Sequence, residues 1–166
     1  MTQLLESHRH AFLPKIGEEF QLDVIYREPA VLAELAGINK GECAFIGPYF
    51  EGRSIYTNVT LQYFGVTNLA QAQVEAKKLG GRLLEGQAWE SFQKRFPVPD
   101  NNRPEAKFVF FGTSEWEMSH NGVRRIACLC NKDGTWKPGL SWSVAAENGL
   151  WLVVKDERPR YRGRFL

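Results

Sequence analysis

Apolar and polar residues alternate, or recur at helical spacing, along the first third of the chain, and they predict strands with one helix between them. Residues 19–26 alternate over most of their length and indicate a strand. Pro29 suits a first helical turn, and the apolar spacing after it predicts a short helix that ends at Gly37. A short strand is expected at 44–46. Residues 54–64 show the clearest strand pattern, because β-branched and aromatic residues dominate them. We expect one face of this strand to carry Ile55, Thr57, Val59, Leu61 and Tyr63.

Two helices are predicted in the middle of the chain. Residues 67–79 form the clearest helical pattern, with Thr67 or Asn68 as the cap and two glycines after the last turn. After a short extended piece, residues 86–96 place Ala88, Trp89, Phe92 and Phe96 at helical spacing. Residues 97–107 contain three prolines and a polar cluster, which predict a surface loop.

The C-terminal part consists of short segments separated by Gly and Asn, and it contains four of the five tryptophans. This pattern predicts a compact, meandering β-unit that buries aromatic area, with the strands at 108–112, 124–130 and 150–155. We expect Trp151, in the apolar run LWLVV, to lie in the core. Trp136 and Trp142 flank KPGLS, which indicates a Pro-Gly turn, and they are therefore expected to be exposed.

Together these elements predict an α+β fold in which two or three helices pack on an irregular antiparallel sheet. We expect residues 54–64 and 150–155 to be neighbouring antiparallel strands, with the helix over 67–79 packed against the sheet. A chain of 166 residues fits one domain, with or without a small appendage. The expected division is a strand–helix extension over 1–50, an α+β domain over 51–156 and a basic tail over 157–166.

From Ser54 to Lys155 the order of elements resembles the C-type-lectin-like fold, in the form shared with formylglycine-generating-enzyme-like modules. The stretches that carry the resemblance are NLAQAQVEAKKLGGRLL, FFGTSEW, VRRIACL and NGLWLVVK. The resemblance implies a strand, two helices, a long irregular segment and a final core strand beside the first. The paired cysteines of secreted lectin-like domains and the family's calcium-and-sugar signature are missing, so the resemblance implies no sugar binding.

The composition narrows the class of protein. An odd number of cysteines, three, and the lack of a signal-peptide pattern favour free thiols in a reducing compartment. We therefore expect a cytoplasmic protein of a bacterium or a mobile genetic element. No stretch approaches 18 apolar residues, so no membrane partner is expected. No cofactor or metal is expected either, because no phosphate-binding, dinucleotide or metal-binding motif occurs.

The leading hypothesis is a non-catalytic binding or interaction module for an unknown protein or small ligand. Its candidate ligand-binding residues are Trp116, Trp136 and Trp142, because exposed tryptophans often mark recognition surfaces. One alternative is an enzyme that uses Cys128 and Cys130, or a pair of acidic residues. The two cysteines share a face if residues 124–130 form a strand, although two small buried apolar side chains explain the pattern better.

The other alternative is an accessory nucleic-acid-binding protein that uses the C-terminal tail. The tail alternates arginine with other residues, two of them aromatic, a pattern that can follow a phosphate backbone and stack on bases. The candidate contacts are Arg158, Arg160, Arg162 and Arg164. Nucleic acid is not the favoured partner, because the rest of the chain is slightly acidic and shows no basic face.

Overall fold

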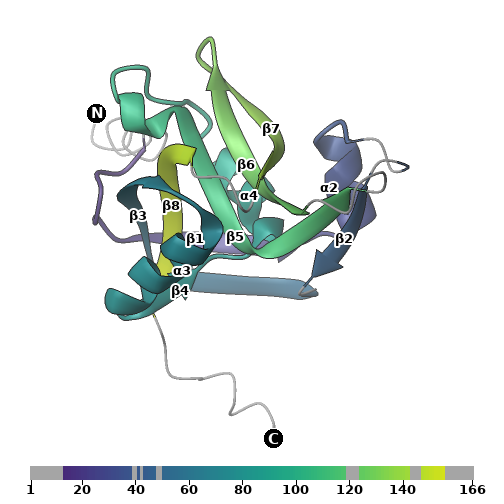
Figure 1. The fold of residues 1–166 in the computed structure, drawn as a ribbon, viewed down its shortest axis with the longest axis horizontal. Coiled ribbons are helices and arrows are strands. Elements are labelled where there is room, and N and C mark those ends of the chain that lie inside the picture. The colour runs from purple at the N-terminus through teal and green to yellow at the C-terminus, as the bar shows by residue number, and fades with distance from the viewer. Residues whose placement is uncertain are drawn as a thin grey trace, which may run out of the picture.

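The computed structural model describes residues 13–38, 41, 43–47, 50–118, 124–142 and 147–155. They form one curled, mixed sheet with helices on both of its faces, so the predicted α+β class is confirmed (Figure 1). Among the described residues, no helix has both the length and the apolar character needed to cross a membrane.

The strands are β1 (Phe20–Tyr26), β2 (Cys43–Gly47), β3 (Gly52–Thr67), β4 (Gly81–Leu83), β5 (Phe108–Met118), β6 (Arg124–Lys132), β7 (Thr135–Trp142) and β8 (Glu147–Lys155). The α-helices are α2 (Pro29–Leu35), α3 (Leu69–Lys78) and α4 (Trp89–Arg95), with 3-10 helices η1 (Gly86–Ala88) and η2 (Pro104–Lys107). The main path of the sheet is β1-β3-β8-β5-β6-β7, and β2 and β4 pair with β5 and β8.

The predicted neighbours β3 and β8 are antiparallel, with Leu61 opposite Leu152. The helix predicted after β3 is α3, and its cap is Asn68: the side chain accepts from Gln71 N, and the Gln71 side chain accepts from Asn68 N. Its buried residues join a cluster with Trp151, so the predicted packing of this helix against the sheet is confirmed.

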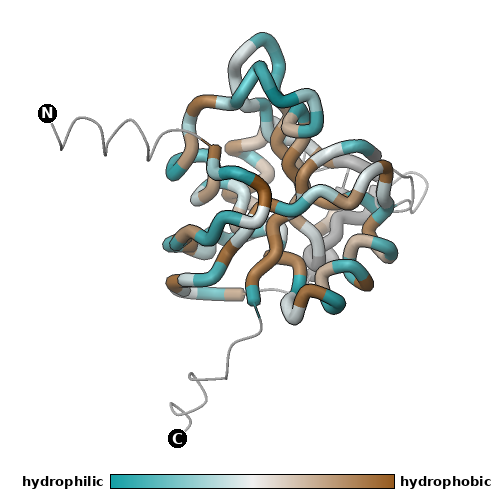
Figure 2. Tube along the Cα trace, turned by 90° about the vertical axis from the view of Figure 1, so that its left-hand side faces the viewer, coloured by the Kyte–Doolittle hydropathy of each residue, from teal (hydrophilic) through white to brown (hydrophobic). Residues whose placement is uncertain are grey.

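The central strands are buried on both faces, which explains their continuous apolar runs. In β8, Leu150, Leu152 and Val154 belong to the larger hydrophobic cluster, together with α4. The alternate residues Trp151 and Val153 belong to a second cluster, together with α3. In Figure 2 the hydrophobic segments accordingly run through the middle of the molecule, and the hydrophilic ones lie mostly at its periphery.

The described part of the N-terminal extension shares the sheet and the core of the rest of the chain. β1 is the edge strand beside β3, and Leu22 and Val24 lie in the larger cluster. From α2, Leu32 joins the same cluster. The strand and the short helix predicted for this segment are therefore both present, and the strand lies at the edge of the common sheet.

The turn predicted at KPGLS is wrong, because these residues lie within β7. Pro138, opposite Leu129, is tolerated because β7 is the last strand on the main path of the sheet, where a missing amide costs no ladder bond. The turn comes earlier, at Asp133 and Gly134, whose φ angles of 53° and 82° suit a two-residue hairpin. The exposure expected for Trp136 is also wrong: the side chain is 3% exposed, and its Nε1 donates to Phe96 O at 2.8 Å.

The single apolar face predicted for β3 is wrong as well. Val59 is fully buried, whereas Ile55 is 46% exposed. Phe20 of β1 pairs with Val59 of β3, whereas Leu22 pairs with Tyr56. This irregularity in the register shifts the alternation of buried and exposed side chains in β3 by one residue between Tyr56 and Val59. As a result Tyr56, and not Ile55, packs against the larger cluster.

Candidate functional site

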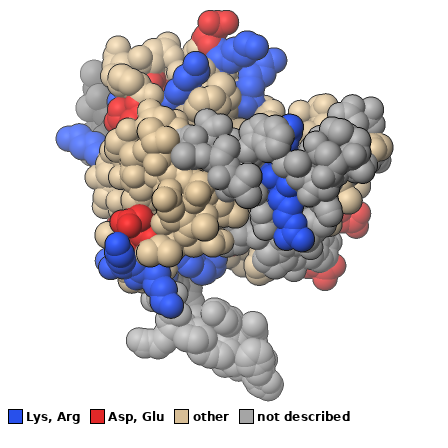
Figure 3. All heavy atoms as spheres, viewed as in Figure 1, with Lys and Arg blue, Asp and Glu red and all other residues tan. Residues whose placement is uncertain are grey.

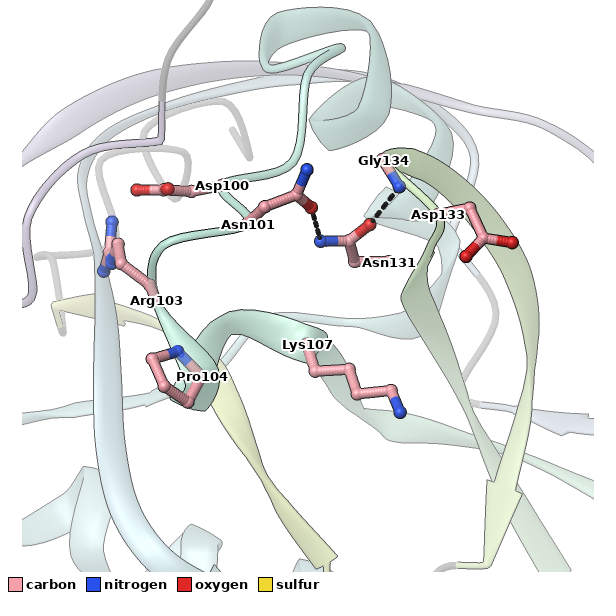
Figure 4. Close-up of a pocket in the computed structure, with 8 residues that line it drawn as sticks. All are labelled: Asp100, Asn101, Arg103, Pro104, Lys107, Asn131, Asp133 and Gly134. Atoms are coloured by element: carbon pink, nitrogen blue, oxygen red, sulfur yellow. Dashed lines mark hydrogen bonds between the residues drawn. The ribbon is translucent and has the colours of Figure 1, made fainter.

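A surface pocket of about 440 Å³ lies between the segment that follows α4 and the β6–β7 hairpin (Figure 4). We call it the loop–hairpin pocket. Its lining residues are Asp100, Asn101, Arg103, Pro104, Lys107, Asn131, Asp133 and Gly134. A second hollow of about 360 Å³, here called the apolar hollow, adjoins it and shares Asp100 and Asn101. Its other lining residues are Leu13, Val98, Pro99 and Asn102.

Two contacts fasten the loop to the hairpin. The Asn131 side chain donates from Nδ2 to Asn101 Oδ1 at 2.7 Å and accepts from Gly134 N at 2.9 Å. These side chains meet across the gap between the two segments (Figure 4). Below them, the buried bond from Trp136 Nε1 to Phe96 O joins the hairpin to the end of α4. The two walls of the loop–hairpin pocket are thus held in place before any ligand arrives.

The charged groups of the pocket are not equally available to a ligand. Arg103 donates from Nη1 to Pro14 O at 2.8 Å, and its Nε lies 3.6 Å from a Glu105 carboxylate oxygen. By contrast, no hydrogen bond or ion pair within the described part of the chain engages the exposed Lys107 ammonium or the exposed Asp133 carboxylate. Asp100 also lines the pocket, and its Oδ1 accepts from Asn102 N at 2.9 Å. The Lys107 ammonium lies 5.9 Å from the centre of the Phe108 ring. The pocket therefore offers one cation and two carboxylates that form no ion pair among the described residues, beside two side-chain amides.

A second polar cluster is buried beneath the β1–β3 ribbon and centres on Glu85, which is 0% exposed. Its Oε1 accepts from the hydroxyl groups of Tyr26 and, at 2.7 Å, Tyr56, and its Oε2 accepts from Arg82 Nη1 at 3.2 Å. The two hydroxyl oxygens are 2.5 Å apart. Burial, followed by the charge of Glu85, raises the pKa of both tyrosines, which keeps both hydroxyl groups protonated near neutral pH.

Gln87, also buried, continues this network two residues later. Its Oε1 accepts from Phe50 N at 3.0 Å, and its Nε2 donates to Phe50 O at 3.1 Å and to Arg27 O at 3.2 Å. Both oxygens of Glu85 and both ends of the Gln87 amide are thus engaged within the protein. This arrangement ties residues 84–88 to β1, to β3 and to the segment before β3. We call it the Glu85 network, and its saturated hydrogen bonding is typical of a structural role.

Sequence reasoning missed both polar features. The Glu85 network depends on residues 26, 56 and 82–87 meeting in space, which no local pattern indicates. The loop–hairpin pocket had a usable signal: a loop rich in Asn, Asp and Pro, and the Asp133-Gly134 dipeptide typical of a hairpin turn.

The cysteine pair on β6 faces the smaller core. Cys128 is buried in the cluster that contains Phe110 and Trp151, Cys130 is half-buried, and neither forms a disulfide with a described residue. Within the described ranges, no three His, Cys, Asp or Glu side chains come together as a metal-binding group. The buried position of Cys128 agrees with the favoured interpretation, in which it is a small apolar side chain of the core.

The structure tests one of the three tryptophans proposed as ligand contacts. Trp136 is buried and has no surface to offer. Trp116 and Trp142 occupy backbone positions on either side of Arg125, on β5 and β7. Their side chains lie outside the described residues, as do Arg158, Arg160, Arg162 and Arg164. The tryptophan pair and the tail therefore stay predictions.

Basic side chains of the described residues do not form one band on the face shown in Figure 3. They lie in separate groups, two of which adjoin acidic side chains. Compared with protein-family models, with curated proteins and with solved structures, the chain matches none. The C-type-lectin-like resemblance of residues 54–155 is accordingly neither confirmed nor contradicted, and any function has to be argued from the geometry of the site.

Proposed function

We propose that this protein is a non-catalytic binding module of the cytoplasm and that the loop–hairpin pocket is its ligand site. The observation that carries the proposal is the combination of a preformed hollow with uncommitted polar groups around it. Asn101 and Asn131 fix the two walls, and the Lys107 ammonium and the Asp133 carboxylate remain available. Loops placed on a rigid sheet are where binding residues concentrate.

The same residues explain why binding is favoured over catalysis. The lining groups are amides, carboxylates and cations, which orient a ligand, and they include no Ser, Thr, Cys or His. Glu85, the buried carboxylate among the described residues, has both oxygens occupied by protein donors and is 0% exposed. A group in that state has no free lone pair directed at solvent with which to accept a proton from a substrate.

The test is an NMR titration of the ¹⁵N-labelled full chain with amino acids, sugars, nucleotides and dicarboxylates. We expect one chemical class to shift the amide signals of residues 100–107 and 131–134 in a saturable way. Asn101→Ala and Lys107→Ala should weaken that binding by about tenfold or more, since a hydrogen bond to a charged group contributes about 1.5–3 kcal/mol.

The matched control is Lys77→Ala, since Lys77 is an exposed lysine on α3 away from the pocket. It should bind the same ligand as the wild type does. Saturable shifts that occur only elsewhere on the protein, or conversion of a ligand during the titration, would contradict the proposal.

A further inference from the structure

We infer that the ligand of the loop–hairpin pocket is a zwitterionic amino acid or short peptide with an apolar side chain. This inference rests on the proposed function and names the chemistry that the site recognises. It comes from three properties of the lining: a cation and carboxylates that form no ion pair among the described residues, the Asn101 amide, which lines both hollows, and the apolar side chains of the second hollow.

The charges select a ligand that carries both signs. Lys107 on η2 and Asp133 on the hairpin line the same pocket, yet no ion pair joins them to each other or to another described residue. Arg103 is occupied by Pro14 O and Glu105, so it adds no free positive charge. An anion would meet the Asp133 carboxylate and a cation would meet the Lys107 ammonium, whereas a zwitterion satisfies both.

The Asn101 amide can hydrogen-bond the peptide group of a ligand. Asn101 uses Oδ1 for Asn131, and its Nδ2 has no acceptor among the described residues. In Figure 4 this nitrogen points away from Asn131. Asn101 lines both hollows, so its free N–H groups are available to donate to a peptide carbonyl bound there.

The apolar hollow provides the place for the side chain. Leu13, Val98 and Pro99 form its apolar part, and Val98 is 48% exposed. An exposed apolar side chain beside a polar site gains contact when a ligand covers it. The hollows of about 440 and 360 Å³ lie in the size range of small-molecule sites, which also admits a short peptide.

The experiment is isothermal titration of the full chain with L-leucine and with the dipeptide alanyl-leucine. Two capped forms of the tighter ligand, one acetylated at the amine and one amidated at the carboxylate, each remove one charge. We expect each capped form to bind about tenfold more weakly than the parent. Comparison of leucine with alanyl-leucine distinguishes a free amino acid from a peptide as the source of this chemistry.

Variants assign each charge to its partner. Lys107→Gln should weaken binding of the parent ligand about tenfold, and amidation should cause no further loss in that variant. Asp133→Asn should do the same for acetylation, and asparagine tolerates the left-handed φ of 53° at this position. Lys77→Gln is the matched control and should leave every affinity unchanged.

Equal binding of the parent and capped ligands, or additive losses in the variants, would overturn the inference. A sugar, nucleotide or dicarboxylate that binds at residues 100–107 and 131–134 while leucine and alanyl-leucine do not would also overturn it, and would leave the proposed function standing. If no class of ligand shifts those residues, both proposals fail.

Discussion

Replacing Glu85 by alanine removes the acceptor of three hydrogen bonds at once. The two tyrosine hydroxyl groups that point at Glu85 are partly buried and would lose their shared partner. Arg82, whose side chain is 45% exposed, can turn to water instead. The cost should therefore come mainly from Tyr26 and Tyr56, and only in small part from the ion pair.

The magnitude follows from these contacts. The two hydroxyl oxygens lie 2.5 Å apart, so one can donate to the other after the substitution and one is left without an acceptor. A buried polar group without a partner costs about 1–3 kcal/mol, and the cavity left by the side chain adds about 2 kcal/mol, which gives a loss of roughly 3–5 kcal/mol. For a chain of this size each kcal/mol lowers Tm by about 2–4 °C, which predicts a fall of roughly 6–20 °C. Glu85→Gln keeps the volume and one acceptor oxygen, and it should cost about 1–3 kcal/mol.

The assay is urea unfolding at pH 7, followed by circular dichroism and compared at equal m-values. Glu75→Ala is the control, because the Glu75 side chain on α3 is 41% exposed and its ion-pair partner is the exposed Lys78, so the substitution should change the free energy of unfolding by less than about 1 kcal/mol. In a double-mutant cycle, Tyr56→Phe and Glu85→Gln should couple by about 1 kcal/mol. A loss below about 1 kcal/mol for Glu85→Ala would refute the structural role of the network.

Three further predictions concern the rest of the fold. The folded pKa of Tyr26 and Tyr56 is raised above 10.0, so the folded state holds more protons than the unfolded state, and the free energy of unfolding should fall as pH rises above about 10; urea unfolding at pH 9, 10 and 11 measures this. Gly149→Ala should reduce the free energy of unfolding by about 1–3 kcal/mol and so lower Tm in a thermal melt, because the added Cβ would lie 2.6 Å from Phe110 Cε2. Trp136→Phe should cost about 1–3 kcal/mol in urea unfolding, because it leaves the buried Phe96 carbonyl without its donor.

Each of these has a matched control. The double variant Tyr26→Phe/Tyr56→Phe should lose most of the alkaline slope, and an unchanged slope would contradict the assignment to these tyrosines. Gly139→Ala meets no atom within 4 Å and should keep the wild-type Tm. If Trp136→Phe unfolds at the same urea concentration as the wild type, the hydrogen bond to Phe96 does not stabilise the hairpin.

Local pattern was sufficient where one face of an element decides its place. Leu69, Ala72 and Ala76 lie on one side of α3, and all three are buried, as the spacing indicates. β8 shows the opposite case, since its uninterrupted apolar run indicates a strand covered on both faces. In both cases the signal, helical spacing in α3 and an unbroken apolar run in β8, lies within the element itself and is therefore present in the sequence.

Pattern failed where distant residues decide. The shift of alternation in β3 depends on its register with β1, so the exposed position of Ile55 cannot be derived from residues 54–64 alone. Pro138 and Gly139 indicate a turn by type, but the Asp133-Gly134 hairpin holds them in an edge strand. Trp136 was chosen as a ligand contact by its residue type, and that choice was wrong. The large apolar surface of a tryptophan side chain suits a recognition surface and a core equally well, and Trp136 lies in the core.

The separation between the Glu85 network and the loop–hairpin pocket gives a way to tell folding from binding. The central strands are covered on both faces, so substitutions there, and at Glu85, change stability first. Lys107 and Asp133 lie on the exposed loop and hairpin, where substitutions usually change stability by less than about 0.5 kcal/mol. Lys107→Gln and Asp133→Asn should therefore unfold with the wild type while binding changes, and Glu85→Gln should lower stability at an unchanged affinity per folded molecule. If the pocket variants instead lower Tm as much as Glu85→Gln does, the loop and hairpin are part of the folding core and the pocket is not an independent site.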